Sequence, residues 1–126
     1  MDLELTKAEE RVMKILWKLK KGVVRDIING YDEPKPAYTT VATILKILEK
    51  KGFVTRKPIA NSFEYRPLVK KSDYTSGIMK SLVKNYFSNS FKNLISDFSK
   101  NENLSTEEME SILEYFKKKL SEKKKK

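Results

Sequence analysis

The segment YTTVATILKILEKKGF, from Tyr38 to Phe53, constrains the fold of this chain more than any other. Its aliphatic side chains recur at helical spacing, so one side of the segment must face a core. The opposite side carries small, hydroxylated or positively charged residues, and no acid precedes Glu49. Lysines followed by Gly52 are typical of a helix C-terminus. The pattern therefore predicts a helix from Tyr38 to Lys51 with an outer face free of bulk and of negative charge.

Two shorter helices are expected before this segment. Thr6-Lys7-Ala8-Glu9 matches a capping box, which predicts the start of a first helix, and Lys21-Gly22 predicts its end. A second helix of about two turns follows around Val24 and Ile28, and the prolines after Tyr31 predict a non-helical connector.

A β-hairpin is expected after the third helix. The arms Phe53–Lys57 and Ser62–Pro67 contain β-branched or aromatic residues at period two, on either side of the turn-prone residues 58–61. Three helices followed by a hairpin are the order of a winged helix-turn-helix. We therefore expect a mainly α protein with a small β-hairpin, in which residues 1–70 form a winged helix-turn-helix DNA-binding domain.

The remainder is predicted to be helical. Residues 71–120 carry amphipathic stripes with no strand to cover them, and residues 121–126 form a basic tail. Such helices are best explained by packing against a second copy in a homodimer, although folding back on the N-terminal domain is the alternative. The residues expected in the helical dimerisation domain's interface are Ile78, Leu82, Tyr86, Phe87, Phe91, Leu94, Met109, Ile112, Leu113 and Phe116.

Positive charge is concentrated rather than spread along the chain. The formal net charge is +10, and residues 34–70 hold eight basic and two acidic side chains. A local basic block of this kind is an electrostatic footprint for a polyanion. The lysines of residues 117–126 suit a helix C-terminus and solubility equally well.

The composition also argues against several classes of protein. The chain has no cysteine and no histidine, so thiol chemistry, histidine acid–base catalysis and an ordinary zinc site are not expected. No glycine-rich phosphate loop is visible, and we expect neither an enzyme nor a cofactor. Because no long apolar run or signal-peptide pattern is present, we expect no membrane insertion and a cytoplasmic location.

The predicted DNA-binding residues lie on the third helix and the wing. Small and hydroxylated side chains allow close approach to base edges, and the cations neutralise phosphates. The expected set is Tyr38, Thr39, Thr40, Ala42, Thr43, Lys46, Lys50, Lys51, Arg56, Lys57 and Asn61.

Several segments resemble the penicillinase-repressor family (BlaI/MecI type) of bacterial transcription regulators. They are Leu5–Glu9 with Val12–Trp17, Ala37–Thr43, Leu48–Phe53, Phe63–Pro67, Leu94–Phe98 and Leu104–Glu108. The likeness implies a homodimeric repressor bound to a palindromic operator and derepressed by cleavage in the dimerisation region, under a membrane sensor-protease of the zinc metallopeptidase type. The bond that matches the family's cleaved Asn-Phe bond is Asp97–Phe98, and Ile47 stands where an arginine is usual. Copper-responsive relatives carry C-terminal cysteines, which this chain lacks.

Two alternatives remain open. In one, aromatic residues between positions 74 and 98 line a pocket, and the protein is a winged-helix regulator that responds to a small ligand. In the other, the winged helix is a protein-interaction adaptor that does not bind nucleic acid.

Overall fold

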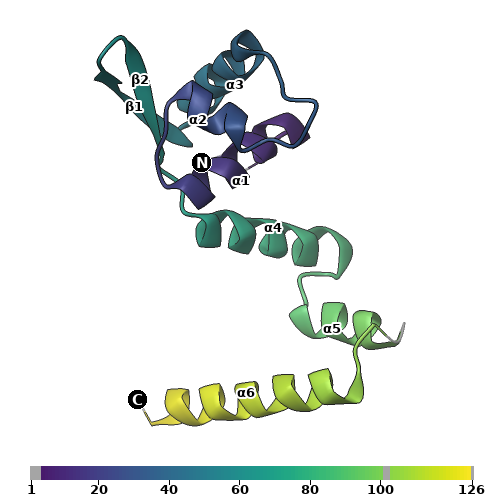
Figure 1. Ribbon diagram of the computed structural model, residues 1–126. Coiled ribbons are helices and arrows are strands. Elements are labelled where there is room, and N and C mark those ends of the chain that lie inside the picture. Colours follow the sequence, from purple (N-terminus) through teal and green to yellow (C-terminus); the bar gives the residue numbers. More distant parts are fainter. Residues whose placement is uncertain (1–3, 101–102, 126) are drawn as a thin grey trace. The chain divides into compact units, whose positions relative to one another are not determined.

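The computed structural model describes residues 4–100 and 103–125, and these residues form helices and one antiparallel hairpin (Figure 1). The elements are α1 (Lys7–Leu19), α2 (Val24–Asn29), α3 (Tyr38–Lys51), β1 (Val54–Ile59), β2 (Ser62–Pro67), α4 (Lys71–Tyr86), α5 (Phe91–Lys100) and α6 (Thr106–Lys124). The predicted fold class is confirmed. The chain divides into two compact units between Met79 and Lys80, inside α4 rather than at its start.

Helix α1 begins at the predicted capping box. The backbone N–H of Glu9 donates to Thr6 Oγ1 at 3.2 Å, and the N–H of Thr6 donates to Glu9 Oε1 at 3.1 Å. Each bond satisfies a donor that the first turn of a helix leaves unpaired.

The end of α1 differs from the prediction. Lys20, with a φ of 74°, is the C-cap, whereas Gly22 lies in a β-bridge whose two hydrogen bonds to Tyr65 measure 2.8 and 3.0 Å. A Cβ atom at Gly22 would lie 3.1 Å from Cβ of Asp26. The prediction that Gly22 ends the first helix was therefore wrong, because Lys20 is the C-cap and Gly22 pairs with Tyr65 of the hairpin.

Helix α3 has the predicted bounds. Gly52 adopts a φ of 85°, and its N–H donates to the Glu49 carbonyl at 3.1 Å, as a helix-terminating glycine does. This turn leads directly into the hairpin, so the helix and the wing are joined by two residues.

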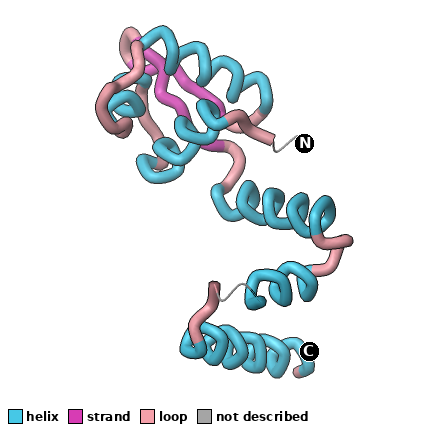
Figure 2. The backbone as a smooth tube through the Cα atoms, turned by 90° about the vertical axis from the view of Figure 1, so that its right-hand side faces the viewer, coloured by secondary structure: helices cyan, strands magenta, loops and turns pink. Residues whose placement is uncertain are grey.

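The hairpin, magenta in Figure 2, pairs β1 with β2 from Val54–Pro67 to Ile59–Ser62. Its turn is tighter than expected, because only Ala60 and Asn61 connect the strands and Ala60 has a φ of 51°. β1 therefore reaches two residues further into the predicted turn.

The first unit has a closed core that includes the start of α4. Trp17 Nε1 donates to the Val69 carbonyl at 2.8 Å, and the ring centroids of Trp17 and Phe53 lie 5.5 and 6.1 Å from that of Tyr74. The buried residues are Val12, Met13, Leu16, Val24, Ile27, Val41, Leu45, Leu48, Phe53, Val54, Tyr65, Val69 and Tyr74. The core thus fixes α3 and the hairpin to α1, α2 and the first turns of α4.

Among its described residues, the second unit buries only one hydrophobic side chain, Val83 of α4, and so has no comparable core. Ser105 caps α6 by accepting a hydrogen bond from the Glu108 N–H at 3.1 Å, yet neither α5 nor α6 has a buried residue. None of the helices in the described ranges is long and apolar enough to cross a membrane.

Candidate nucleic-acid interface

The two sides of α3 differ as the sequence predicts. Val41, Leu45 and Leu48 are completely buried in the core of the first unit. The opposite side is exposed to solvent and presents Thr39, Thr40, Thr43, Lys46 and Lys50. We call these five residues the α3 outer face. Their outward position is observed, whereas contact with DNA remains a prediction.

The remaining predicted α3 residues border this face. Tyr38, at the first position of the helix, is 50% exposed, and Ala42 is half-buried. Ile47 was not in the predicted set but is also 41% exposed. Its spacing of four residues from Thr43 is the sequence signal that places both side chains on neighbouring turns of one face.

The lysines of the outer face are unpaired. Lys46 and Lys50 make no ion pair with any residue in the part of the chain that the structure describes, whereas Glu49 is bound by Arg56 at 3.2 Å. The acid nearest to this face is therefore neutralised by the wing, and the lysine charges remain available to an anionic partner.

The wing is basic, but its charges are partly balanced. Lys57 and Arg66 contact Glu64 at 3.8 and 3.2 Å, and the guanidinium of Arg56 lies 4.2 Å from the ring centroid of Phe63. These contacts hold long cationic side chains along the hairpin. Asn61 is exposed in the turn at its tip.

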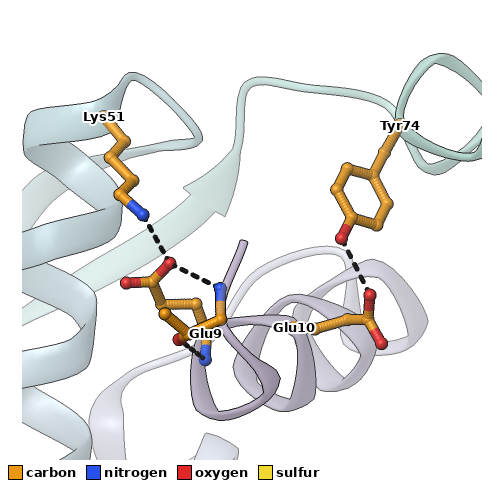
Figure 3. A network of polar contacts seen from close by, with 5 residues as sticks. Glu9, Glu10, Lys51 and Tyr74 are labelled. Carbon is orange, nitrogen blue, oxygen red and sulfur yellow. Dashed lines mark hydrogen bonds and ion pairs between the residues drawn. The ribbon is translucent and has the colours of Figure 1, made fainter. Parts of the chain in front are cut away.

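Lys51 has a structural partner. Its ammonium lies 2.6 Å from Glu9 Oε1, the oxygen that also accepts from the Thr6 N–H (Figure 3). Glu9 is only 5% exposed. Lys51 therefore ties the end of α3 to the start of α1, a contact between residues distant in sequence that helical periodicity does not reveal.

The buried carboxylate of Glu9 and its neighbour Glu10 have altered acidities. Burial raises the pKa of Glu9, but the hydrogen bonds from Lys51 and Thr6 and the charge of Lys51 outweigh it, so the pKa is lowered overall. The hydrogen bond from Tyr74 lowers the pKa of Glu10. The Tyr74 hydroxyl donates to Glu10 at 2.8 Å, and burial raises the pKa of Tyr74 to about 12 (Figure 3).

Most residues predicted for dimerisation are exposed. Only Phe87 and Leu94 are half-buried, while Ile78, Leu82, Tyr86, Phe91, Met109, Ile112, Leu113 and Phe116 are exposed. Tyr115 and Leu120, which the predicted set omitted, are 58% and 54% exposed. The apolar stripe of α6 thus extends to Leu120, as the helical period of the sequence predicts, although Leu120 was not among the residues expected in the interface.

A hollow of about 520 Å³ lies at the junction of α4 and α5. Its lining residues are Tyr86, Phe87, Ser88, Asn93, Ser96, Asp97 and Lys100. Tyr74 does not line it, because Tyr74 is buried in the core of the first unit.

The residues of the candidate cleavage bond, Asp97 and Phe98, are exposed on α5. No cluster of metal-binding side chains occurs among the described residues.

Three helices, a two-stranded wing and an exposed basic face on the third helix together define a winged helix-turn-helix DNA-binding protein. The family model for the penicillinase repressor matches residues 5–118, and the chain belongs to this family. It is a DNA-binding repressor. The family consists of transcriptional repressors and is not a family of enzymes.

Individual relatives agree with this assignment. The methicillin resistance regulatory protein MecI of Staphylococcus aureus (strain N315) is 32% identical over 110 residues, which are 86% of this chain and 89% of the relative. The penicillinase repressor of Bacillus licheniformis is 26% identical over 110 residues, 86% of each chain. The solution structure of the DNA binding domain of the repressor BlaI matches 56% of this chain and 88% of that domain, with 29% identity and a TM-score of 0.50.

Proposed function

We propose that this chain is a cytoplasmic homodimeric repressor that binds a palindromic operator and is derepressed by cleavage in its dimerisation region. The observation that carries the proposal is the combination of an exposed, unpaired basic face on α3 with an uncovered apolar stripe on α6. The first supplies a surface for a nucleic-acid duplex, and the second supplies a surface for another copy.

The α3 outer face supports insertion into the major groove. Its threonines are small enough to approach base edges, and Lys46 and Lys50 have no competing carboxylate within the described chain. Arg56 and Lys57 are exposed on the wing, and in the proposal they contact phosphates of the flanking backbone. Asn61 at the tip of the wing and Tyr38 at the start of α3 complete the proposed interface. Lys51, at the end of α3, binds Glu9 and is partly exposed, so we keep it in the proposed interface as a phosphate contact.

The stripe of α6 supports a homodimer. Leu113, Phe116 and Leu120 are each more than half exposed at helical spacing, and a contiguous apolar surface of this kind marks an interaction site. Two-fold symmetry is the commonest arrangement of soluble homo-oligomers. It brings two recognition helices to successive half-sites of a palindrome about one helical turn apart.

Cleavage between Asp97 and Phe98 would remove α6 from the DNA-binding unit. The bond lies in α5, near its C-terminal end, so a protease must first unwind the last turns of a short helix that has no buried residue. In the proposal a membrane sensor-protease of the zinc metallopeptidase type provides the signal. Separation of the subunits then weakens operator binding.

The test is a mobility shift with DNA from upstream of the protein's own operon, at two salt concentrations. The double variant Lys46→Glu/Lys50→Glu is expected to abolish the shift while the dimer and its melting temperature are retained. The matched control, Lys18→Glu/Lys21→Glu, makes the same charge change on exposed lysines outside the proposed interface. Equal losses in both variants, or unfolding of the first, would show that the α3 outer face is not the binding surface.

The hollow at the junction of α4 and α5 favours a second candidate, a repressor that is released by a small ligand. Its volume of about 520 Å³ is within the usual range for ligand sites, and aromatic, carboxylate and ammonium side chains line it. A thermal-shift screen with a metabolite panel distinguishes control by a ligand from control by cleavage. A ligand that raises the melting temperature and releases DNA supports the ligand-responsive repressor. Loss of repression only after cleavage supports proteolytic derepression.

A further inference from the structure

The three threonines of the α3 outer face are not equivalent. The hydroxyl of Thr43 donates a hydrogen bond to the Thr39 carbonyl at 2.8 Å, one turn back along the same helix. Within residues 4–100 and 103–125, the hydroxyls of Thr39 and Thr40 make no such bond. Of these three threonines, only Thr39 and Thr40 have a hydroxyl hydrogen available to a ligand.

The bond changes the chemistry that Thr43 presents. A threonine hydroxyl has a single hydrogen, and at Thr43 the helix backbone already takes it. The same bond favours one side-chain rotamer, because a β-branched residue in a helix has few alternatives. The other branch at Cβ is a methyl group, and the residue is exposed. Thr43 therefore offers DNA a fixed methyl group in place of a hydrogen-bond donor.

Ile47 extends this apolar character by one turn. It is 41% exposed and lies four residues after Thr43, so the two side chains are neighbours on the helix surface. An exposed isoleucine between Lys46 and Lys50 adds nothing to phosphate binding. Its aliphatic surface is complementary to an apolar group, and the major groove contains one such group, the C5 methyl of thymine.

We propose that Thr43 and Ile47 form an apolar strip that reads thymine through its C5 methyl group. This inference rests on the proposed function, because it assumes that α3 enters the major groove of an operator. Thr39 and Thr40 then provide the hydroxyl donors and acceptors for neighbouring base edges, and Thr43 and Ile47 determine specificity at thymine positions.

The experiment replaces each thymine of an operator fragment, one at a time, by deoxyuridine, which lacks only the methyl group. The wild-type dimer is expected to lose about fourfold in affinity at a contacted thymine in each half-site, the factor that burial of one methyl group contributes. Replacements outside the contacted positions should leave the affinity unchanged.

Two substitutions at position 43 assign the effect. Thr43→Val keeps a methyl group and removes the hydroxyl, and it should bind with unchanged affinity and unchanged sensitivity to uracil. Thr43→Ser keeps the hydroxyl and removes the methyl group in both subunits. It should bind about 16-fold more weakly, about fourfold for each half-site, with no sensitivity at that thymine. Ile47→Ala should abolish sensitivity at an adjacent thymine. The position is exposed, and circular-dichroism melts verify that each variant folds.

The inference would be overturned if Thr43→Val lost operator binding and Thr43→Ser retained it. That result would mean that the Thr43 hydroxyl, not its methyl group, contacts DNA. Uniform tolerance of uracil by a wild-type protein that still binds its operator would also overturn it, while leaving the proposed function intact. Failure of the wild type to bind any upstream fragment specifically would instead overturn the proposed function and this inference with it.

Discussion

The two units use the same kinds of apolar side chain in opposite ways. Phe53, in the first unit, is completely buried against Tyr74, whereas Phe116 in the second is 53% exposed. The first unit closes its core with helices, a hairpin and the start of α4. The second places comparable stripes on α5 and α6 without burying one residue of either helix. A helical apolar stripe thus shows that a surface needs covering, but it does not say whether the same chain covers it.

The difference has a physical reason. A strand or helix from elsewhere in the first unit packs on each apolar face, and the free energy of burial is gained within one chain. Helices α5 and α6 have no sheet beside them among the described residues of their unit, so their apolar stripes are left exposed within that unit. The first unit should therefore be stable alone, and the second should depend on protein concentration.

The largest effect is expected from charges in the α6 stripe. The double variant Leu113→Glu/Phe116→Glu should yield monomers, because two carboxylates cannot be buried unpaired in a dimer interface. Loss of bivalent binding should weaken operator affinity by about 100-fold or more. Sedimentation velocity measures the first result, and a titration with labelled operator measures the second.

A control on the same helix separates charge from position. Ser111→Glu/Lys118→Glu also adds negative charge to exposed positions of α6, but on the side opposite the stripe. It should sediment like the wild type. If the stripe variant also sediments unchanged, α6 is not the dimer interface, and the contrast between the units needs another explanation.

A large loss of stability, but not of assembly, is expected from the first unit's core. Phe53→Ala removes a completely buried ring and should cost about 3–5 kcal/mol of unfolding free energy. The melting temperature should fall equally at low and high protein concentration, whereas that of the α6 stripe variant should lose the wild type's concentration dependence.

Tyr115→Ala is the matched control for this variant. Tyr115 is 58% exposed on α6. In the background of the Leu113→Glu/Phe116→Glu variant, where no dimer covers it, its removal should change the free energy of unfolding by no more than about 0.5 kcal/mol. A loss as large as that of Phe53→Ala would mean that the second unit has a core of its own.

Sequence reasoning succeeded where the determinants are local. The capping box at Thr6 and the glycine stop at Gly52 lie within a few residues of the ends they define, and helical spacing separates the two sides of α3. It failed where a contact joins distant segments. The pairing of Gly22 with Tyr65 and of Lys51 with Glu9 depends on how elements pack, which no local pattern contains.

Within the candidate DNA-binding site, too, the sequence does not distinguish residues that the structure separates. The sequence places Thr39, Thr40 and Thr43 on one face but treats them alike, because they have the same side chain. Only the position of a hydroxyl relative to a carbonyl one turn back distinguishes Thr43. DNA contact by any of them stays a prediction, which the proposed binding experiments address.

The smallest effect concerns the acid dependence of the first unit's stability. The pKa of Glu9 in the folded protein is below its ordinary value of 4.5, because the contacts with Lys51 and Thr6 outweigh burial. A carboxylate with a depressed folded pKa stabilises the fold above its unfolded pKa, and this contribution is lost as the pH falls from about 4.5 through the folded pKa. Glu9→Gln should therefore reduce the unfolding free energy at neutral pH by about 1 kcal/mol and make its decline in acid shallower.

Urea denaturation at neutral pH and at several values below pH 4.5 measures both quantities. Glu114→Gln, at an exposed position of α6, should leave the stability and its acid decline unchanged. If Glu9→Gln retains the full acid decline, the pH dependence arises elsewhere, and the Glu9–Lys51 contact does not couple α1 to α3. If the unfolding free energy of Glu9→Gln alone declines less steeply in acid, part of the acid sensitivity lies in the first unit, at the contact between Glu9 of α1 and Lys51 of α3.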